Sequence, residues 1–405
     1  MNRILKVGCI IFFIFFLSLS AFALLPQQVH AQTVTTAVTV GTPASDTENV
    51  AVTPNGAYAY VTNYESGTVS VISTATNTVT ATVTPAATPG ADTTLGGVAV
   101  TPNGAYAYVT NYDPGTVLVI STATNTVTAT VTVGTDPDGV AVTPNGAYAY
   151  VTNYGSGTVS VINTGTNTVT ATVTVGSEPD GVAVTPNGAY VYVTSYGNAV
   201  SVINTATNTV TTTVNITGFP AGAYGPAVTP NGEYVYVADS EYHAVSVIST
   251  ATNTITATVT VGNNPYVVAF TPNGAYAYVT NEGVGTVSVI NTATNTVTAT
   301  VTVGSEPWGV AVTPNGEYVY VANSNDGTVS VISTGTTTST PSPTATSAPT
   351  STSTSAPTTT PTTASPTPKI PEFSSAALVS VSIFMIALTV SAVAWKTRTR
   401  KTLRI

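Results

Sequence analysis

The sequence has almost no cations outside its two ends. Arg3, Lys6 and Lys369 and five residues after position 395 make up its eight Lys and Arg, so none occurs in residues 32–368. Nucleic-acid binding needs Lys and Arg to displace counterions from phosphates. We therefore exclude a nucleic-acid partner, and the formal net charge of −9 at pH 7 agrees with this.

Cysteine and helix-forming residues are also scarce. The only cysteine is Cys9, which lies in an N-terminal leader and leaves the rest of the chain without a disulfide or a thiol nucleophile. Thr, Val, Ala, Asn, Gly and Tyr dominate, and only 6% of residues are charged. Because Val, Thr and Tyr favour strands, the composition indicates an all-β protein.

Both ends of the chain carry targeting patterns. Residues 1–31 begin with two basic residues, continue with an apolar run and end with small residues, which is the order of a secretory signal peptide. An uncleaved N-terminal anchor is the alternative. Residues 372–395 include 20 uncharged residues, enough for one transmembrane helix. Residues 396–405 form a basic cytoplasmic tail by the positive-inside rule, which places the rest of the chain at the cell surface.

A stalk precedes the apolar segment. Residues 335–371 are nearly all Ser, Thr, Pro and Ala and have no apolar face to bury, so we expect them to be disordered. Such a stalk either carries O-linked glycans or is a bare spacer.

Residues 32–334 contain seven copies of one repeat. The Pro of the word TPNG stands at positions 54, 102, 144, 186, 230, 272 and 314, with spacings of 48, 42, 42, 44, 42 and 42. A period of about 40–45 residues built only from strands is typical of a β-propeller with one four-stranded blade per repeat. The sequence therefore predicts an all-β, seven-bladed β-propeller.

One repeat shows the expected blade. Its strands are Gly139–Thr143, Ala147–Asn153, Thr158–Asn163 and Thr168–Val175, and Pro144-Asn145-Gly146 suits a tight hairpin between the first two. We place the short first strand innermost. The seventh repeat lacks a fourth strand, and the N-terminal segment Thr33–Val40 has the missing pattern, so we predict that this strand closes the last blade.

The repeats resemble a known family. The word YVTN begins at Tyr60, Tyr108, Tyr150 and Tyr278, and variants begin at Tyr192, Tyr236 and Tyr320. Word, period and turn together resemble the YVTN-repeat β-propeller family. Its archaeal surface-layer members imply a non-enzymatic cell-surface glycoprotein for envelope structure, adhesion or ligand binding, with envelope components or surface glycans as partners. Similar seven-bladed folds among lactonases and lyases imply the alternative, an extracellular enzyme using a metal and carboxylates.

The C-terminal segment carries a second resemblance. Pro371-Glu372-Phe373, the apolar residues and the basic tail are similar to the PEF-CTERM sorting signal of some archaea. That resemblance implies cleavage near the motif and transfer to a lipid. An ordinary single-pass anchor is the alternative.

Acidic residues gather on one predicted rim. Fourteen of the sixteen Asp and Glu residues in 32–368 fall in loops that follow second and fourth strands, which share one end of the ring. They either solvate a Thr/Val-rich protein or bind a divalent cation. In TDPDG and SEPDG an extended backbone would point paired acids to one side, which predicts weak Ca²⁺ binding at Asp136, Asp138, Glu178 and Asp180.

The remaining candidates are few. Asn215 starts an N-glycosylation sequon, and Tyr266 and Trp308 either stack on a sugar ring or pack on the rim. His243 has no neighbour that completes a catalytic pair, so we read it as a loop residue. Near-identical repeats predict no asymmetric cluster at the axis, and we therefore assign no catalytic residue.

Overall fold

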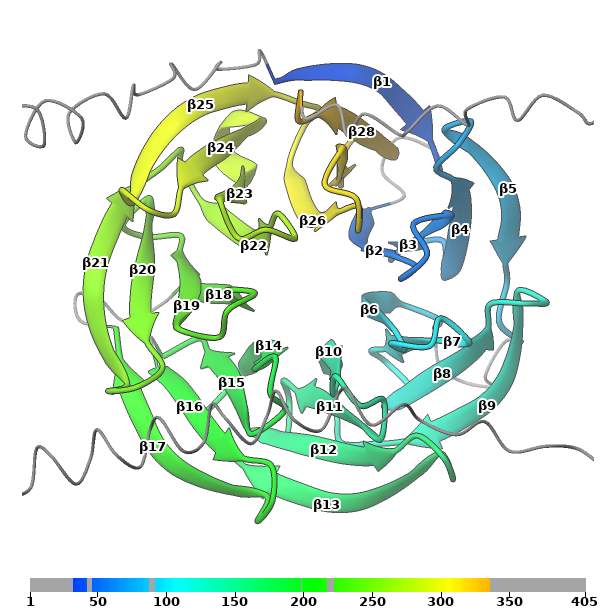
Figure 1. Cartoon of the computed structure of the whole chain (residues 1–405). Coiled ribbons are helices and arrows are strands. Elements are labelled where there is room, and N and C mark those ends of the chain that lie inside the picture. Colours follow the sequence, from blue (N-terminus) through cyan, green and yellow to red (C-terminus); the bar gives the residue numbers. More distant parts are fainter. Residues whose placement is uncertain (1–31, 42–45, 87–91, 198, 217–221, 336–405) are drawn as a thin grey trace, which may run out of the picture. The chain divides into compact units, whose positions relative to one another are not determined.

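The chain forms a ring of seven antiparallel four-stranded sheets (Figure 1). The computed structural model describes residues 32–41, 46–86, 92–197, 199–216 and 222–335. Within these residues the predicted all-β, seven-bladed propeller of four-stranded blades is confirmed. The signal peptide, almost all of the stalk and the C-terminal apolar segment fall outside them. The described part of the chain contains no helix with the length and apolar character needed to cross a bilayer.

Each blade contributes one strand to each of four concentric layers, and the first strands surround the axis (Figure 1). The first strands are β2 (Thr47–Val52), β6 (Leu95–Val100), β10 (Pro137–Val142), β14 (Pro179–Val184), β18 (Ala223–Val228), β22 (Pro265–Phe270) and β26 (Pro307–Val312). The second strands are β3 (Tyr58–Asn63), β7 (Tyr106–Asn111), β11 (Tyr148–Asn153), β15 (Tyr190–Ser195), β19 (Tyr234–Asp239), β23 (Tyr276–Asn281) and β27 (Tyr318–Asn323).

The two outer layers complete the blades. The third strands are β4 (Thr68–Ser73), β8 (Thr116–Ser121), β12 (Thr158–Asn163), β16 (Ala199–Asn204), β20 (Ala244–Ser249), β24 (Thr286–Asn291) and β28 (Thr328–Ser333). The outermost strands are β5 (Thr78–Val83), β9 (Thr126–Thr132), β13 (Thr168–Thr174), β17 (Thr209–Asn215), β21 (Thr254–Thr260), β25 (Thr296–Thr302) and β1 (Thr33–Thr39).

The seventh blade is built from both ends of the propeller. Strand β1 runs antiparallel to β28, with Thr33 opposite Ser333 and Thr39 opposite Thr328. The sheet order is β1-β28-β27-β26, so its outermost strand comes from the N-terminal segment. Figure 1 shows this blue strand beside the orange β28.

The repeated TPNG word forms the hairpin between first and second strands. In the third blade the Gly146 amide donates to the Thr143 carbonyl over 2.8 Å, and Gly146 has φ 72°, a left-handed value that glycine adopts without strain. Asn145 Oδ1 accepts from the Ala147 amide over 3.0 Å. A Cβ on Gly146 would lie 3.6 Å from Cδ of Pro102, so each turn also contacts the turn of the preceding blade.

The core lies between blades, and a buried tyrosine of each second strand crosses every junction. These seven tyrosines are at most 1% exposed. The Tyr150 hydroxyl donates to Asn208 Oδ1 of the next blade over 2.9 Å, and Asn208 has φ 51°, which Asn tolerates better than most residues. The neighbouring Tyr148 is 38% exposed. The Tyr and Asn of the repeats therefore bind adjacent blades together at six of the seven junctions, and the hydroxyl of Tyr278 at the junction with blade 7 has no such Asn.

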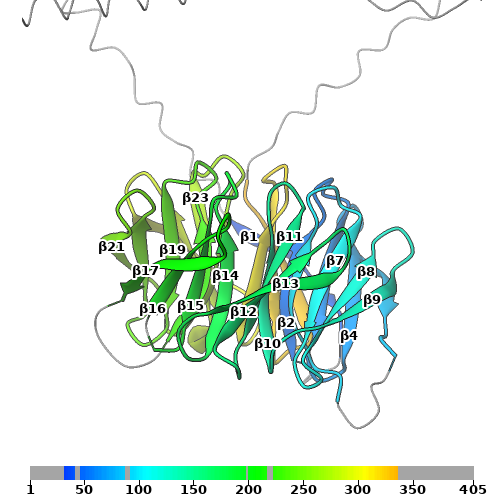
Figure 2. The same ribbon diagram turned by 90° about the horizontal axis from the view of Figure 1, so that it is seen from below.

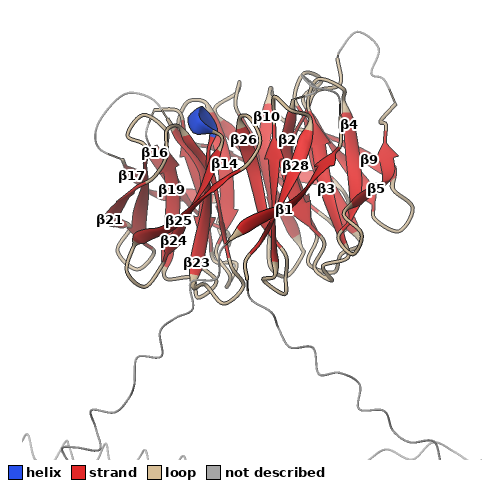
Figure 3. Ribbon diagram, turned by 90° about the horizontal axis from the view of Figure 1, so that it is seen from above, coloured by secondary structure: helices blue, strands red, loops and turns tan. Residues whose placement is uncertain are grey.

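The loops divide into two rims (Figure 2). One rim holds the TPNG turns and the turns between third and fourth strands. The other holds the loops after second and fourth strands, including the short helix η1 (Glu282–Val284) after β23, seen at one end of the ring in Figure 3. The candidate site lies at this second rim, which we call the variable rim.

Candidate functional site at the mouth of the channel

A β-bulge at the start of every first strand directs one residue toward the axis. In β10, Pro137 pairs with Asn153 and Val140 pairs with Val151. The chain therefore advances three residues along β10 while it advances two along β11, which is one extra residue in β10. The same shift occurs in the other six blades. Bulges bend a strand and re-aim its side chains, and here they bring the second residue of each first strand to the channel.

In blades 1, 2, 3 and 6 the Thr of the YVTN word holds the corresponding residue of the next blade in place. Thr152 Oγ1 donates to the Asp180 carbonyl of the next blade over 2.5 Å and accepts from the Gly139 amide of its own blade over 2.7 Å. Thr110 bonds to the Asp138 carbonyl in the same way, over 2.6 Å. The repeat word thus fixes the backbone at Gly96, Asp138, Asp180 and Trp308 and leaves the side chain at these positions free to vary.

The seven residues at this position form what we call the channel ring, and their chemistry is asymmetric. In blade order they are Glu48, Gly96, Asp138, Asp180, Tyr224, Tyr266 and Trp308. Blades 1, 3 and 4 contribute carboxylates, and blades 5 to 7 contribute aromatic rings. The expectation that near-identical repeats leave no asymmetric cluster at the axis is therefore wrong, because the repeats differ at the one position that the bulge turns inward.

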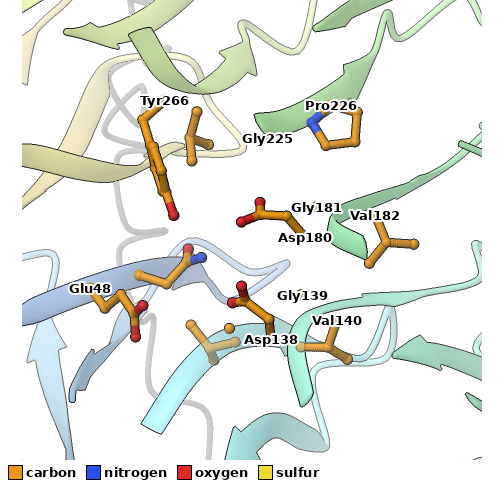
Figure 4. A pocket seen from close by; sticks show the side chains of 14 residues that line it. Glu48, Asp138, Gly139, Val140, Asp180, Gly181, Val182, Gly225, Pro226 and Tyr266 are labelled. Carbon is orange, nitrogen blue, oxygen red and sulfur yellow. The ribbon is translucent and has the colours of Figure 1, made fainter. Parts of the chain in front are cut away.

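Two adjoining cavities contain these side chains. A channel cavity of about 170 Å³ lies among the first strands and is lined by Glu48, Asp138, Asp180 and Tyr266 (Figure 4). A mouth cavity of about 370 Å³ shares those four residues. Its outer wall adds the residue after each second strand in blades 1 to 4, namely Tyr64, Tyr112, Tyr154 and Tyr196.

The three carboxylates lie close together. A Cβ on Gly96 would lie 3.5 Å from Glu48 Oε2 and 3.5 Å from Asp138 Oδ1, so these oxygens are at most twice that distance apart. Asp138 and Asp180 share a side-chain hydrogen bond, which requires one proton between the two carboxyl groups. Oε2 of Glu48 is buried and has no hydrogen-bond partner. Figure 4 shows all three carboxyl groups facing a common space with the Tyr266 hydroxyl.

Burial dominates the electrostatics of this cluster. Desolvation raises the pKa of Asp138 from 3.8 to about 6, against the lowering effect of the hydrogen bond from Asp180. Desolvation and the neighbouring Asp138 charge raise the pKa values of Asp180 and Glu48 well above their usual range. Burial followed by the charge of Asp180 also raises the pKa of Tyr266. Ionising these carboxyl groups therefore costs free energy, because no Lys or Arg occurs in residues 32–368 to balance their negative charge.

The aromatic half of the ring forms a continuous arc. The Tyr224 and Tyr266 ring centroids are 4.7 Å apart, and those of Tyr266 and Trp308 are 5.0 Å apart at an interplanar angle of 29°. Tyr266 and Trp308 pack against each other, and their stacking on a sugar ring stays a prediction. All three rings also line the mouth cavity, so the arc presents aromatic surface to it.

The four residues predicted to bind Ca²⁺ do not all converge. Asp138 and Asp180 meet, but Asp136 and Glu178 line neither cavity. The extended backbone assumed for both loops is wrong: Asp136 and Glu178 have φ 52° and 51°, because their carbonyls turn to accept the amides of Tyr154 and Tyr196. Among the described residues, no group of three or more His, Cys, Asp or Glu has the geometry to hold a metal ion.

The other candidate residues lie elsewhere. Nδ1 of His243 accepts from the Asn264 amide over 3.2 Å, and His243 lines neither cavity. Asn215 is exposed at the end of β17, where a glycan has access from solvent. Sequence reasoning missed Glu48 as a site residue, although aligning the repeats at the second residue of the first strand displays the whole channel ring.

Comparisons with known proteins support the fold. Residues 27–175 match the family model described as "Lactonase, 7-bladed beta-propeller". A solved structure of hydrazine synthase from Kuenenia stuttgartiensis is similar, with a TM-score of 0.65, 22% sequence identity, and coverage of 73% of this chain and 97% of that one. At that identity the likeness shows the fold alone. No curated protein matches the chain in sequence.

Proposed function

We propose that this chain is a non-enzymatic cell-surface propeller of the YVTN surface-layer type that binds a ligand at its mouth cavity. The observation that carries the proposal is the division of the channel ring into carboxylate and aromatic parts. The strands and the TPNG turns are otherwise nearly identical from blade to blade, and burying three carboxyl groups costs stability. Costly, asymmetric features in a cavity are typical of binding sites.

The surface location rests on the sequence. The leader, the Ser/Thr/Pro stalk and the apolar segment with its basic tail support display outside the cell, either on a single transmembrane helix or after a PEF-CTERM-type transfer to a lipid. A binding cavity on a stalked, rigid ring suits adhesion or capture of envelope components and surface glycans.

A second candidate is a lactonase-type enzyme, favoured by the family-model match over residues 27–175. Catalysis of that kind needs a general base and a group that stabilises negative charge. The ionised carboxylate of the Asp138–Asp180 pair supplies a base, but the surrounding carboxylates disfavour an oxyanion. For that reason we place binding first.

One experiment separates the two candidates. The purified full-length chain is mixed with a panel of lactones, envelope glycans and small amines, and both its melting temperature and any product are measured, the latter by mass spectrometry. A ligand that raises the melting temperature without being converted supports binding. Conversion of a lactone that Asp138→Asn with Asp180→Asn abolishes, but Asp92→Asn at an exposed site does not, would establish the enzyme instead.

A further inference from the structure

We propose that the mouth cavity binds an organic cation, with its ammonium group between the carboxylates and the aromatic arc. This inference rests on the proposed function, because it names the ligand class of the same cavity. Three independent features of the cavity lead to it: uncompensated charge, an unpaired buried oxygen and an aromatic wall.

The charge of the cavity lacks a partner. Glu48, Asp138 and Asp180 face one space, and residues 32–368 contain no Lys or Arg that could pair with them. Burial raises the pKa of Asp138 to about 6, so the pair that it forms with Asp180 carries negative charge at neutral pH. Oε2 of Glu48 is buried without a hydrogen-bond partner, whereas buried polar atoms nearly always have one. A bound cation would balance the negative charge of the carboxyl groups and give Oε2 of Glu48 a partner.

The opposite wall decides what kind of cation fits. Tyr224, Tyr266 and Trp308 form a stacked arc that lines the same cavity as the carboxylates. Aromatic faces attract cations through the ring quadrupole, most strongly Trp, and the attraction is larger for weakly hydrated ammonium groups in desolvated sites. A cavity with aromatic rings on one side and carboxyl groups on the other matches an alkylated ammonium group. Its charge can face the carboxyl groups while its carbons contact the rings.

A bare metal ion fits less well. Calcium takes six to eight oxygen ligands at about 2.3–2.6 Å. Among the described residues, no group of three or more His, Cys, Asp or Glu side chains could hold a metal ion. The mouth cavity of about 370 Å³ is also far larger than one ion and lies in the size range of small-molecule sites.

The test uses a pair of probes that differ in charge and hardly in shape. Binding of choline and of its neutral carbon analogue 3,3-dimethylbutan-1-ol to the purified full-length chain is measured by calorimetry at about pH 8, where Asp138 is ionised. Calcium chloride at the same ionic strength is the third arm. We expect choline to bind at least about tenfold more tightly than the alcohol.

Variants then assign the binding to the cavity. Asp138→Asn with Asp180→Asn should abolish the preference for choline, Trp308→Ala should weaken choline binding about tenfold, and Trp308→Phe should lose less because an aromatic face remains. Asp92→Asn, at an exposed position outside both cavities, should change nothing. Melting curves establish that each variant is folded.

The failures are distinguishable. Equal binding of the alcohol and choline overturns the cation assignment and leaves ligand binding intact. If calcium binds, choline does not, and the double Asp variant no longer binds calcium, the cavity is a metal site and the cation assignment is overturned. If no probe and no member of the wider panel binds, the cation assignment and the proposed function both fail.

Discussion

Replacing Asp138 by Asn should stabilise the propeller at about pH 7.5 and leave its stability almost unchanged at about pH 4. Asp138 is a first-strand residue whose carboxyl lies beside Asp180 and Glu48 in the channel ring. Asn has the same shape, can still form a hydrogen bond with Asp180 and carries no charge. The variant therefore isolates the cost of ionising one carboxyl in this cavity.

The sign follows from the direction of the pKa change. Because burial raises the pKa of Asp138 from 3.8 to about 6, the native state binds more protons than the unfolded state between these values. The free energy of unfolding of the natural chain is then highest below the unfolded pKa and falls as the pH rises through the folded pKa. Asp180 and Glu48, whose pKa values are also raised, extend this loss to higher pH.

The magnitude is modest but measurable. A rise from 3.8 to about 6 corresponds to about 3 kcal/mol at most, and screening at the open mouth lowers this toward about 1 kcal/mol. With an unfolding entropy near 2 cal/mol/K per residue, a propeller of about 300 residues gains about 2–5 °C in melting temperature.

The assay is thermal unfolding followed by circular dichroism from about pH 4 to pH 8 at constant ionic strength. The matched control is Asp92→Asn, an exposed Asp outside the cavity. The two curves of Asp138→Asn and the natural chain should converge at about pH 4, separate as the pH rises from about 4 to about 6, and stay apart at higher pH. A variant that is less stable at pH 7.5, or one whose gain is the same at every pH, would refute the electrostatic reasoning.

Three further predictions concern the ring and its display. Deleting residues 32–41 removes β1 and should expose the edge of β28, so the truncated protein should aggregate in light scattering; a monomer with unchanged melting would show that the strand does not close the ring. Tyr150→Phe removes the bond to Asn208 and should cost about 1 kcal/mol in denaturant unfolding, whereas Tyr148→Phe, at an exposed ring, should cost almost nothing; equal effects would disprove the role of the junction. A broad-specificity protease added to intact cells should release the propeller by cutting within 334–368, while trypsin, without a Lys or Arg to cut in 32–368, should not cut that stretch; protection of 334–368 from the broad-specificity protease would contradict surface display.

The blade architecture follows from the sequence because its determinants are local. The TPNG turn, the alternating Val and Thr of each strand and the left-handed Asn after the third strand act within a few residues, and their period fixes seven blades. From the absence of Lys and Arg in residues 32–368 the sequence likewise predicts that the propeller has no nucleic-acid partner.

The site was decided by tertiary structure. Glu48, Asp138 and Asp180 lie far apart in the chain and meet because the ring brings every first strand to one axis and a bulge turns its second residue inward. Asp136, two residues from Asp138, turns away because its left-handed backbone serves a loop hydrogen bond. Sequence spacing alone placed Asp136 and Asp138 in one predicted site and omitted Glu48. The direction of a side chain depends on bulges and on partners contributed by other blades, which spacing does not reveal.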